Sequence, residues 1–191
     1  MPHPRHFTAA DLATMPEDGK RYEVIDGDLF VSPCPGGRHQ PIVIRLIDAL
    51  AQYLKPGRRM DELLAGPADI TFAEDSLVEP DVLVADTAAF LRTGDWRDVT
   101  TMHLVVEIIS PSTARTDRTR KLSLYQRYGV PTYWIVDPIA RQIESWTPLA
   151  TSAVVHRDTI EWRHPALADS LTIDLGKLFT FDAPESPQGE R

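Results

Sequence analysis

The sequence predicts an α/β fold, in which a mixed β-sheet is flanked by helices. The main observation is a succession of three segments with short connections: an apolar run at residues 102–109, a helix-forming stretch that ends at Gly129, and a second apolar run at residues 132–137. This succession is typical of a βαβ unit, so the two strands should be parallel and lie close together. Several shorter runs of alternating apolar residues, bounded by turn-forming residues, indicate further strands.

The first part of the chain should form a hairpin followed by a helix. Residues 20–26 and 28–32 have the character of short strands, and Asp26-Gly27 between them is a strong signal for a tight hairpin turn. After a loop rich in proline and glycine, apolar residues recur at helical spacing over residues 40–54. We therefore expect an amphipathic helix there.

The rest of the chain alternates between strands and connecting segments. We expect strands at residues 61–65, 68–72 and 81–85 before the βαβ unit, and at 141–147, 153–156 and 171–174 after it. Residues 87–101 should form a loop with a short helix. Residues 1–181 should form a single domain, and residues 182–191, which contain two prolines and a glycine, should form a flexible tail.

Composition limits the class of protein. The 191-residue chain is 42% hydrophobic and 25% charged, which excludes a disordered or collagen-like chain. Its single cysteine, Cys34, can form neither an internal disulfide nor a cysteine-rich zinc site and indicates a reducing compartment. No apolar run approaches the ~20 residues of a membrane span. We therefore expect a cytoplasmic protein without a membrane partner.

Charge is unevenly distributed along the chain. The net charge of −8 argues against a protein that coats nucleic acid non-specifically. Between residues 112 and 128, however, five basic side chains stand against one acidic side chain. Arg115, Arg118 and Arg120 in this segment are candidates for contacting nucleic acid, although the segment could equally be a solvated helix face.

Glu107 is the first candidate for chemistry. It interrupts an apolar run that has the pattern of a central strand buried on both faces. A buried carboxylate without a partner is costly, so it normally shifts its pKa, pairs with a cation or binds a metal. Alternatively, Glu107 lies at the end of its strand and reaches water, at the edge where α/β sheets bind ligands.

Asp81 and Lys121 are the next candidates. Asp81 follows Pro80 at the start of a strand, where proline fixes the entry of the chain, although Pro-Asp also occurs in ordinary turns. Together with Glu107, it would supply oxygen ligands of the kind that hold Mg²⁺. At about 100° per residue, Lys121 lies in the stripe of its helix that faces the sheet, with Asp117, Leu124, Tyr125 and Tyr128 within about 40°.

Three environments are open to the ammonium group of Lys121. It could reach water while its stem packs on apolar surface, or pair with Asp117 one turn earlier. It could instead reach the carboxylate pair formed by Asp81 and Glu107. Two acids and a lysine around a metal form a phosphodiester-cleaving site, because the metal lowers the pKa of bound water and the lysine offsets developing negative charge.

An ordered set of motifs covers most of the chain. The motifs are Arg21-Tyr-Glu-Val-Ile-Asp-Gly-Asp28, Ser32-Pro33 before His39-Gln40, Glu79-Pro80-Asp81-Val82, Leu104-Val-Val-Glu-Ile-Ile-Ser-Pro-Ser112, Lys121 with Tyr125, and Gly129-Val130 before Tyr133-Trp134-Ile-Val-Asp-Pro138. As a set they are far more specific than any one of them. The chain resembles the Uma-two family of restriction endonucleases, within the PD-(D/E)XK superfamily.

The resemblance implies a restriction-endonuclease-like fold and a metal-dependent nuclease core. Asp81 matches the first acid of the family and Glu107 the second, so both would be catalytic and hold Mg²⁺, with Mn²⁺ as the alternative ion. The superfamily usually has a lysine two residues after the second acid, where this chain has Ile109. Lys121 matches a lysine that has moved to the following helix.

Two further positions match the family. Glu23 would complete the acidic cluster as a catalytic residue, or would be a solvent-facing residue of the hairpin. His39 also matches, but a histidine at the start of a helix is more often structural.

Two functions therefore compete. The first is a Mg²⁺-dependent endonuclease that cleaves DNA, with a homodimer as one way to cut both strands. The second is a catalytically inert binding or assembly module that retains the nuclease fold, which the acidic net charge and Ile109 favour. A carboxylate in the centre of an apolar strand favours the first function, because Leu or Val would be less costly there. The motifs of serine hydrolases, zinc peptidases, P-loop proteins and dinucleotide-binding enzymes are absent from the sequence.

Overall fold

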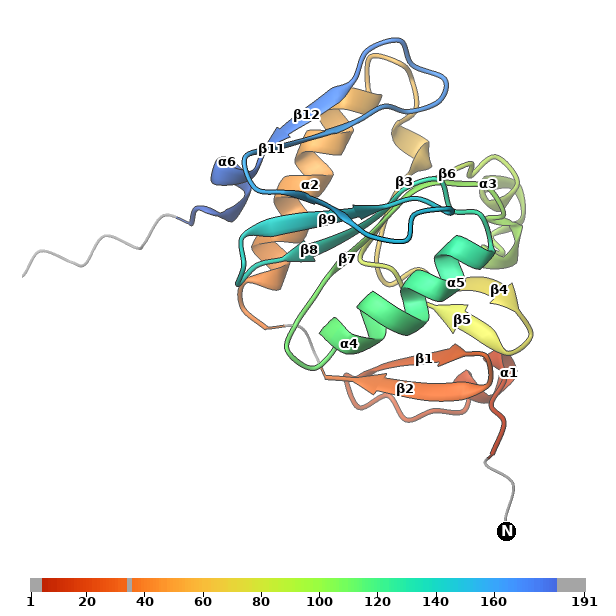
Figure 1. Ribbon diagram of the computed structural model, residues 1–191. Helices are drawn as coiled ribbons and strands as arrows, with labels where there is room; N and C mark the ends of the chain where they lie inside the picture. Colours follow the sequence, from red (N-terminus) through yellow and green to blue (C-terminus); the bar gives the residue numbers. More distant parts are fainter. Residues whose placement is uncertain (1–4, 34–35, 182–191) are drawn as a thin grey trace, which may run out of the picture.

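The structure, a computed structural model, describes residues 5–33 and 36–181 (Figure 1). Cys34 and the predicted tail at residues 182–191 lie outside the described residues. The helical elements are α1 (Ala9–Leu12), α2 (His39–Leu54), η1 (Met60–Glu62), α3 (Phe90–Thr93), η2 (Trp96–Asp98), α4 (Ala114–Thr116), η3 (Asp117–Lys121), α5 (Leu122–Arg127) and α6 (Leu175–Phe179). Of the three η elements, η1 and η2 are 3₁₀ turns and η3 is a π-helical turn.

The strands form three sheets. They are β1 (Arg21–Ile25), β2 (Asp28–Ser32), β3 (Leu63–Ala65), β4 (Ile70–Ala73), β5 (Ser76–Val78), β6 (Val82–Ala85), β7 (Met102–Ile108), β8 (Tyr133–Asp137), β9 (Gln142–Trp146), β10 (Val154–His156), β11 (Thr159–Trp162) and β12 (Leu171–Asp174). The central sheet has the order β10-β9-β8-β7-β6-β3, a second sheet has the order β2-β1-β5-β4, and β11 pairs with β12.

The predicted βαβ unit is confirmed. Strands β7 and β8 are parallel neighbours in the centre of the six-stranded sheet, and Glu107 is paired with Ile135. The remaining pairs of this sheet are antiparallel, so the sheet is mixed as predicted. The chain crosses from β7 to β8 through α4, η3 and α5, which cover one face of the sheet (Figure 1).

Two apolar clusters lie on the two faces of the central sheet. On one face, α2 packs on β6, β7 and β8, and β11, β12 and α6 extend the same cluster. On the other face, residues of α5 pack between the central sheet and strands β4 and β5 of the second sheet. The helix formed by α4, η3 and α5 therefore lies between two sheets, and its inward face is closed off from water.

The hairpin turn is also confirmed. Asp26 and Gly27 both have positive φ angles, 52° and 78°, as a tight two-residue turn between antiparallel strands requires. A Cβ atom on Gly27 would lie 2.0 Å from Nδ1 of His6, so the position also lacks room for a side chain.

The crossover helix ends where the sequence predicts, but it contains a π-helical turn that the sequence does not reveal. Gly129 adopts a left-handed conformation with φ of 69°, and the N–H of Val130 donates to the carbonyl of Tyr125. The π-helical turn spans Asp117 and Lys121 and buries both side chains.

Some predicted elements differ from the structure. Residues 61–62 belong to a 3₁₀ turn rather than a strand, and β5, β11, α1 and α6 were not predicted. Tyr128 was predicted to lie on the inward face of the crossover helix, but it is 45% exposed, because the helix has already ended at Arg127. Its ring packs against Phe72 of β4, at the edge of the second sheet. Within the described residues, the search for a helix of membrane-spanning length and hydropathy found none.

Candidate active site

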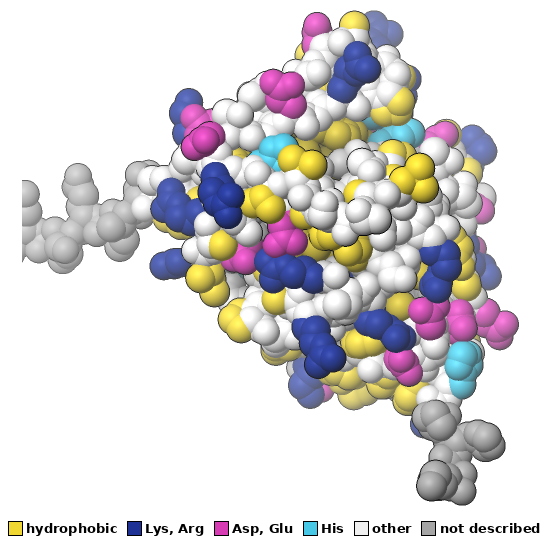
Figure 2. Space-filling view, in the orientation of Figure 1, with side chains coloured by type: hydrophobic (Ala, Val, Ile, Leu, Met, Phe, Trp, Pro, Cys, Tyr) yellow, Lys and Arg dark blue, Asp and Glu magenta, His cyan; other side chains and the backbone are white. Residues whose placement is uncertain are grey.

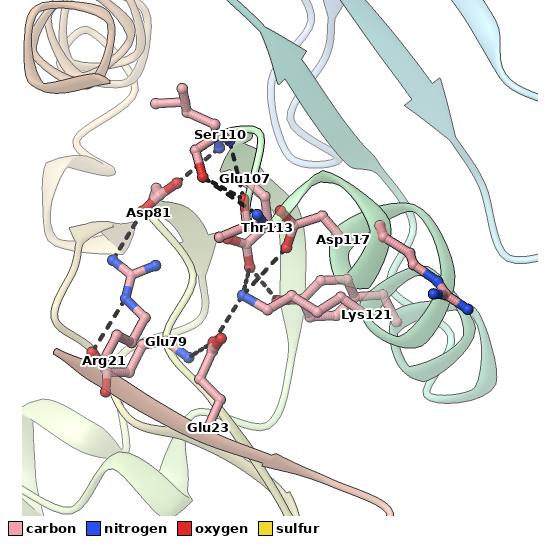
Figure 3. A network of polar contacts seen from close by, with 12 residues as sticks. Arg21, Glu23, Glu79, Asp81, Glu107, Ser110, Thr113, Asp117 and Lys121 are labelled. Carbon is pink, nitrogen blue, oxygen red and sulfur yellow. Dashed lines mark hydrogen bonds and ion pairs between the residues drawn. The ribbon is translucent and has the colours of Figure 1, made fainter. Parts of the chain in front are cut away.

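A pocket lies where the start of β6 meets the end of β7. It brings together ionisable side chains from β1, the start of α2, the segment before β6, strand β7 and the crossover helix. Figure 3 labels all of them except the one from α2. These side chains are Arg21, Glu23, His39, Asp81, Glu107, Asp117 and Lys121. All four residues predicted to be catalytic from the sequence therefore lie in one pocket, although up to 98 residues of chain separate them.

Glu107 is enclosed in this pocket rather than in contact with bulk water. It is 2% exposed, and its Oε1 accepts hydrogen bonds from Nζ of Lys121 and from the hydroxyl of Tyr125, both at 2.8 Å. Burial raises the pKa of Glu107 well above its ordinary value, against the opposing effect of the Lys121 charge. Among the described residues, the second oxygen, Oε2, accepts no hydrogen bond.

Lys121 pairs with several carboxylates at once. Its Nζ lies 2.8 Å from Glu107, 2.8 Å from Oε1 of Glu23 and 3.7 Å from Oδ1 of Asp117. The residue is 2% exposed, so the ammonium group does not reach water along an apolar surface. Burial alone would lower the pKa of Lys121, but the neighbouring carboxylates outweigh it and raise the pKa above its ordinary value.

Glu23 belongs to the acidic cluster and does not face solvent. It is 3% exposed, and besides pairing with Lys121 it accepts a hydrogen bond from the N–H of Glu79 at 2.8 Å. The reason is its place in the fold: β1 is an inner strand of the second sheet, and one face of that sheet packs against the crossover helix.

Asp81 is held by the guanidinium of Arg21, the ring of His39 and one backbone group. Oδ1 accepts from Nη2 of Arg21 at 3.0 Å, and Oδ2 lies 2.8 Å from the N–H of Ile108 and 2.9 Å from Nε2 of His39. Burial would raise the pKa of Asp81, but the hydrogen bond with His39 and the charge of Arg21 outweigh it and lower the pKa. Asp81 is therefore ionised at neutral pH.

Sequence reasoning missed two members of this network. Arg21 was not selected, yet it lies two residues before Glu23, and residues at that spacing share one face of a strand. His39 was interpreted as a structural residue at a helix start, but its ring contacts Asp81 and lines the pocket. At the usual lysine position, Ile109 is buried in the apolar cluster beside Tyr125, so a charged side chain there would have no room near water.

The arginines predicted to contact nucleic acid have partners within the protein. Arg118 donates to Glu144 at 2.6 Å and to Asp137 at 3.1 Å, whereas Arg120 donates to Asp28 at 2.6 Å. Arg115 is exposed, and no ion pair involving it is found within residues 5–33 and 36–181. On the visible face, basic side chains over the crossover helix are interspersed with acidic ones (Figure 2).

The carboxylates of the pocket are donors of the chemical type that a divalent cation preferring oxygen would take. Asp81 directly precedes β6, and Glu107 lies in β7, the antiparallel neighbour of β6 in which Val106 pairs with Val82. Carboxylate oxygens of this kind suit Mg²⁺ or Mn²⁺. The positive charges of Arg21 and Lys121 balance the negative charges of the carboxylates in this structure, and the ring of His39 contacts Asp81. A bound ion would have to share or replace these contacts.

Comparisons with known proteins agree with this geometry. The model of the Uma2 family, described as "Putative restriction endonuclease", matches residues 9–176. A crystal structure of a protein from Anabaena variabilis, described as a putative nuclease belonging to DUF820, superposes with a TM-score of 0.70 at 21% sequence identity. The match covers 91% of this chain and 97% of that chain, and it shows a shared restriction-endonuclease-like fold. A search of curated proteins found no match. Because the family model covers most of the sequence, the chain belongs to the Uma2 family.

Proposed function

We propose that the protein is a metal-dependent endonuclease that hydrolyses phosphodiester bonds in DNA. The observation that carries the proposal is the convergence of Asp81, Glu107, Lys121 and Glu23 in one pocket, from segments far apart in the sequence. Membership of a family of nucleases supports the same reaction class.

In this proposal, Asp81 and Glu107 hold Mg²⁺, or Mn²⁺ in its place. A bound ion of this kind polarises a phosphoryl oxygen and lowers the pKa of a coordinated water. The backbone N–H of Ile108 and the ring of His39 fix the orientation of Asp81, and the hydroxyl of Tyr125 fixes that of Glu107. Positioning of this kind reduces the reorganisation needed when the transition state forms.

Lys121 is the cationic residue of the proposed mechanism. Its ammonium group already lies 2.8 Å from Glu107, so it can offset negative charge on the phosphoryl group next to that carboxylate. Glu23 holds the other side of the ammonium group and thereby positions it. The usual superfamily lysine position is therefore not needed for a cation to reach the acids.

DNA would contact the protein through the basic side chains near the pocket. Arg115 is the exposed candidate, and Arg118 and Arg120 would have to exchange carboxylate partners for phosphate groups. Such contacts release counterions, so DNA binding should weaken steeply as salt rises. A second copy of the chain would supply the second active site for cutting both strands.

The competing function is an inert module that retains the fold. The ion pairs of Lys121 favour it, since they stabilise the carboxylates without any metal. The two functions differ in whether the carboxylates bind a divalent cation.

Calorimetry with Mn²⁺ distinguishes the two functions. The wild-type protein should bind one ion at the pocket, and Asp81→Asn, which keeps the size of the side chain, should lose this binding. The matched control is Asp48→Ala, because Asp48 is exposed on α2 and, within the described part of the chain, its side chain forms a hydrogen bond with Gln52 alone. If the wild type binds no Mn²⁺ with or without duplex DNA, and cleaves none, the inert module is the correct function.

A further inference from the structure

A second group of metal-ligating side chains lies away from the pocket. The group consists of Glu62 at the end of η1, His103 in β7 and His164 after β11. Each residue offers one ligand atom, and the three atoms lie within 4.8 Å of one another. None of the three lines the candidate active site. His103 and Glu107 lie on the same strand, four residues and roughly 13 Å apart.

A β-bulge accounts for the position of His103. Along the β6–β7 pair, Val84 is paired with Leu104 but Ala85 is paired with Met102, so His103 is the extra residue of the bulge. A bulge changes the direction of the side chain at that point of the strand. The ring of His103 thereby comes to lie 4.6 Å from the ring of His164, between centroids.

Two ligand atoms of this cluster are buried without a hydrogen bond. Oε2 of Glu62 and Nε2 of His164 lie 2.8 Å apart, at ion-pair distance, but their geometry is not that of a hydrogen bond, and neither atom forms a hydrogen bond with another described residue. His164 is 1% exposed, so within the described residues its buried Nε2 has only the carboxylate of Glu62 as a polar neighbour at short distance. Buried polar atoms of this kind are normally satisfied by a partner, an ordered water or an ion.

The surroundings orient the carboxylate toward the histidine. Nη1 of Arg59 donates to Oε1 of Glu62, which leaves Oε2 directed at His164. The N–H of Ala166 donates to Nδ1 of His164 at 3.1 Å, so the neutral ring carries its proton on Nε2. Binding an ion at Nε2 would move this proton to Nδ1 and cost the contact with Ala166, which limits the affinity.

We propose that Glu62, His103 and His164 form a zinc-binding site. Two imidazole nitrogens and one carboxylate oxygen are a ligand set typical of Zn²⁺ and unlike the oxygen-only set that Mg²⁺ prefers. Tetrahedral ligands at zinc distances lie about 3.3 Å apart, so only a small separation of Glu62 and His164 is needed. A bound ion would connect the segment after β11 to the start of β7 and to η1. It would therefore stabilise the packing of the β11–β12 hairpin against the rest of the protein.

The test is calorimetric titration of the full chain with Zn²⁺, combined with thermal unfolding. The wild type should bind one ion at this site, and its Tm should rise by about 5–11 °C when free Zn²⁺ is about 100 times Kd. His103→Gln should weaken the binding at least tenfold. His103 is chosen because it is the partly exposed histidine of the cluster, so its replacement leaves the core intact. His156→Gln is the matched control, since His156 lies in β10 outside the cluster, and it should bind as the wild type does.

The same titration separates this site from the proposed active site. Asp81→Asn should retain Zn²⁺ binding, and Co²⁺ bound to this variant should show the visible absorption of a tetrahedral ion. Binding that survives in His103→Gln but is lost in Asp81→Asn would place the ion at the active site and overturn the zinc proposal. Absence of binding by the wild type would also overturn it, while leaving the nuclease proposal untouched.

Discussion

Replacing Lys121 with methionine tests the central ion-pair network. The change keeps an unbranched apolar stem and removes the ammonium group that Glu23, Glu107 and Asp117 share. These carboxylates are 3–4% exposed, so water cannot take over the role of the lysine. Removing one partner of a buried ion pair costs about 3–5 kcal/mol, because an uncompensated charge remains inside. For a chain of this length, this loss corresponds to a decrease in Tm of about 6–20 °C.

The assay is urea and thermal unfolding in EDTA, so that no ion replaces the lysine. The control is Lys20→Met, since Lys20 pairs with Asp18 and its side chain is half exposed, and the expected change there is within about 0.5 kcal/mol. Adding Glu23→Gln to Lys121→Met should recover part of the loss, because one fewer carboxylate then lacks a cation. A loss below about 1 kcal/mol for Lys121→Met at neutral pH would refute the reasoning, since it would mean that the ammonium group is solvated.

Further predictions concern four other positions. Glu107→Gln should abolish metal-dependent cleavage in a nuclease assay while circular dichroism shows an intact fold; full activity would remove Glu107 from the mechanism. Tyr125→Phe should cost about 1.5–3 kcal/mol in urea unfolding, because Glu107 loses a hydroxyl donor while the ring packing remains. Burial raises the pKa of the Glu79 carboxyl from its ordinary value of 4.5 to about 7. The folded protein therefore holds the proton of this carboxyl more tightly than the unfolded chain does, and its stability falls as the pH rises from about 4.5 to 7. Glu79→Gln should therefore raise Tm relative to the wild type at pH 8 but not at pH 4.5, measured in EDTA; an equal difference at both pH values would contradict this. Gly27→Ala should lower the free energy of unfolding by at least about 1 kcal/mol in the same assay, because alanine is strained at a positive φ and its Cβ would meet His6. An unchanged midpoint of the unfolding transition would show that the turn adapts to the extra methyl group.

Elements with strong local signals could be predicted from the sequence. The Asp26-Gly27 turn and the two apolar strands of the βαβ unit depend on local periodicity and turn chemistry, and both are present. Strand β5 is three residues long, too short to show a period, and is fixed by its pairing with β1 and β4. The π-helical turn leaves no pattern because its wider hydrogen-bond spacing depends on the contacts that Asp117 and Lys121 make inside the protein.

The residues of the candidate site also fall into two groups, those with a local signal in the sequence and those placed only by tertiary contacts. Glu107 and Lys121 could be selected because a charged group at an apolar position is visible in the sequence itself. Local pattern alone does not predict the partners of these groups. Glu23 could be selected only through the resemblance to the family, and it approaches Lys121 only when the second sheet docks against the central sheet. His39 likewise approaches Asp81 only when α2 docks. The bulge at His103 is equally invisible, since it is a property of the register between β6 and β7.

Two arginines of the crossover helix make the β1–β2 hairpin sensitive to salt. Arg120 pairs with Asp28, which follows the hairpin turn, and Arg127 pairs with Asp26, which is part of the turn. The hairpin carries Glu23 of the acidic cluster. These pairs are partly exposed, and dissolved ions screen such pairs at physiological ionic strength and above. Raising the salt concentration therefore loosens the hairpin as well as weakening contacts with phosphate groups. A fall in activity with salt would then combine weaker substrate capture with a less rigid acidic cluster, and single-turnover rates at saturating DNA would separate the two effects.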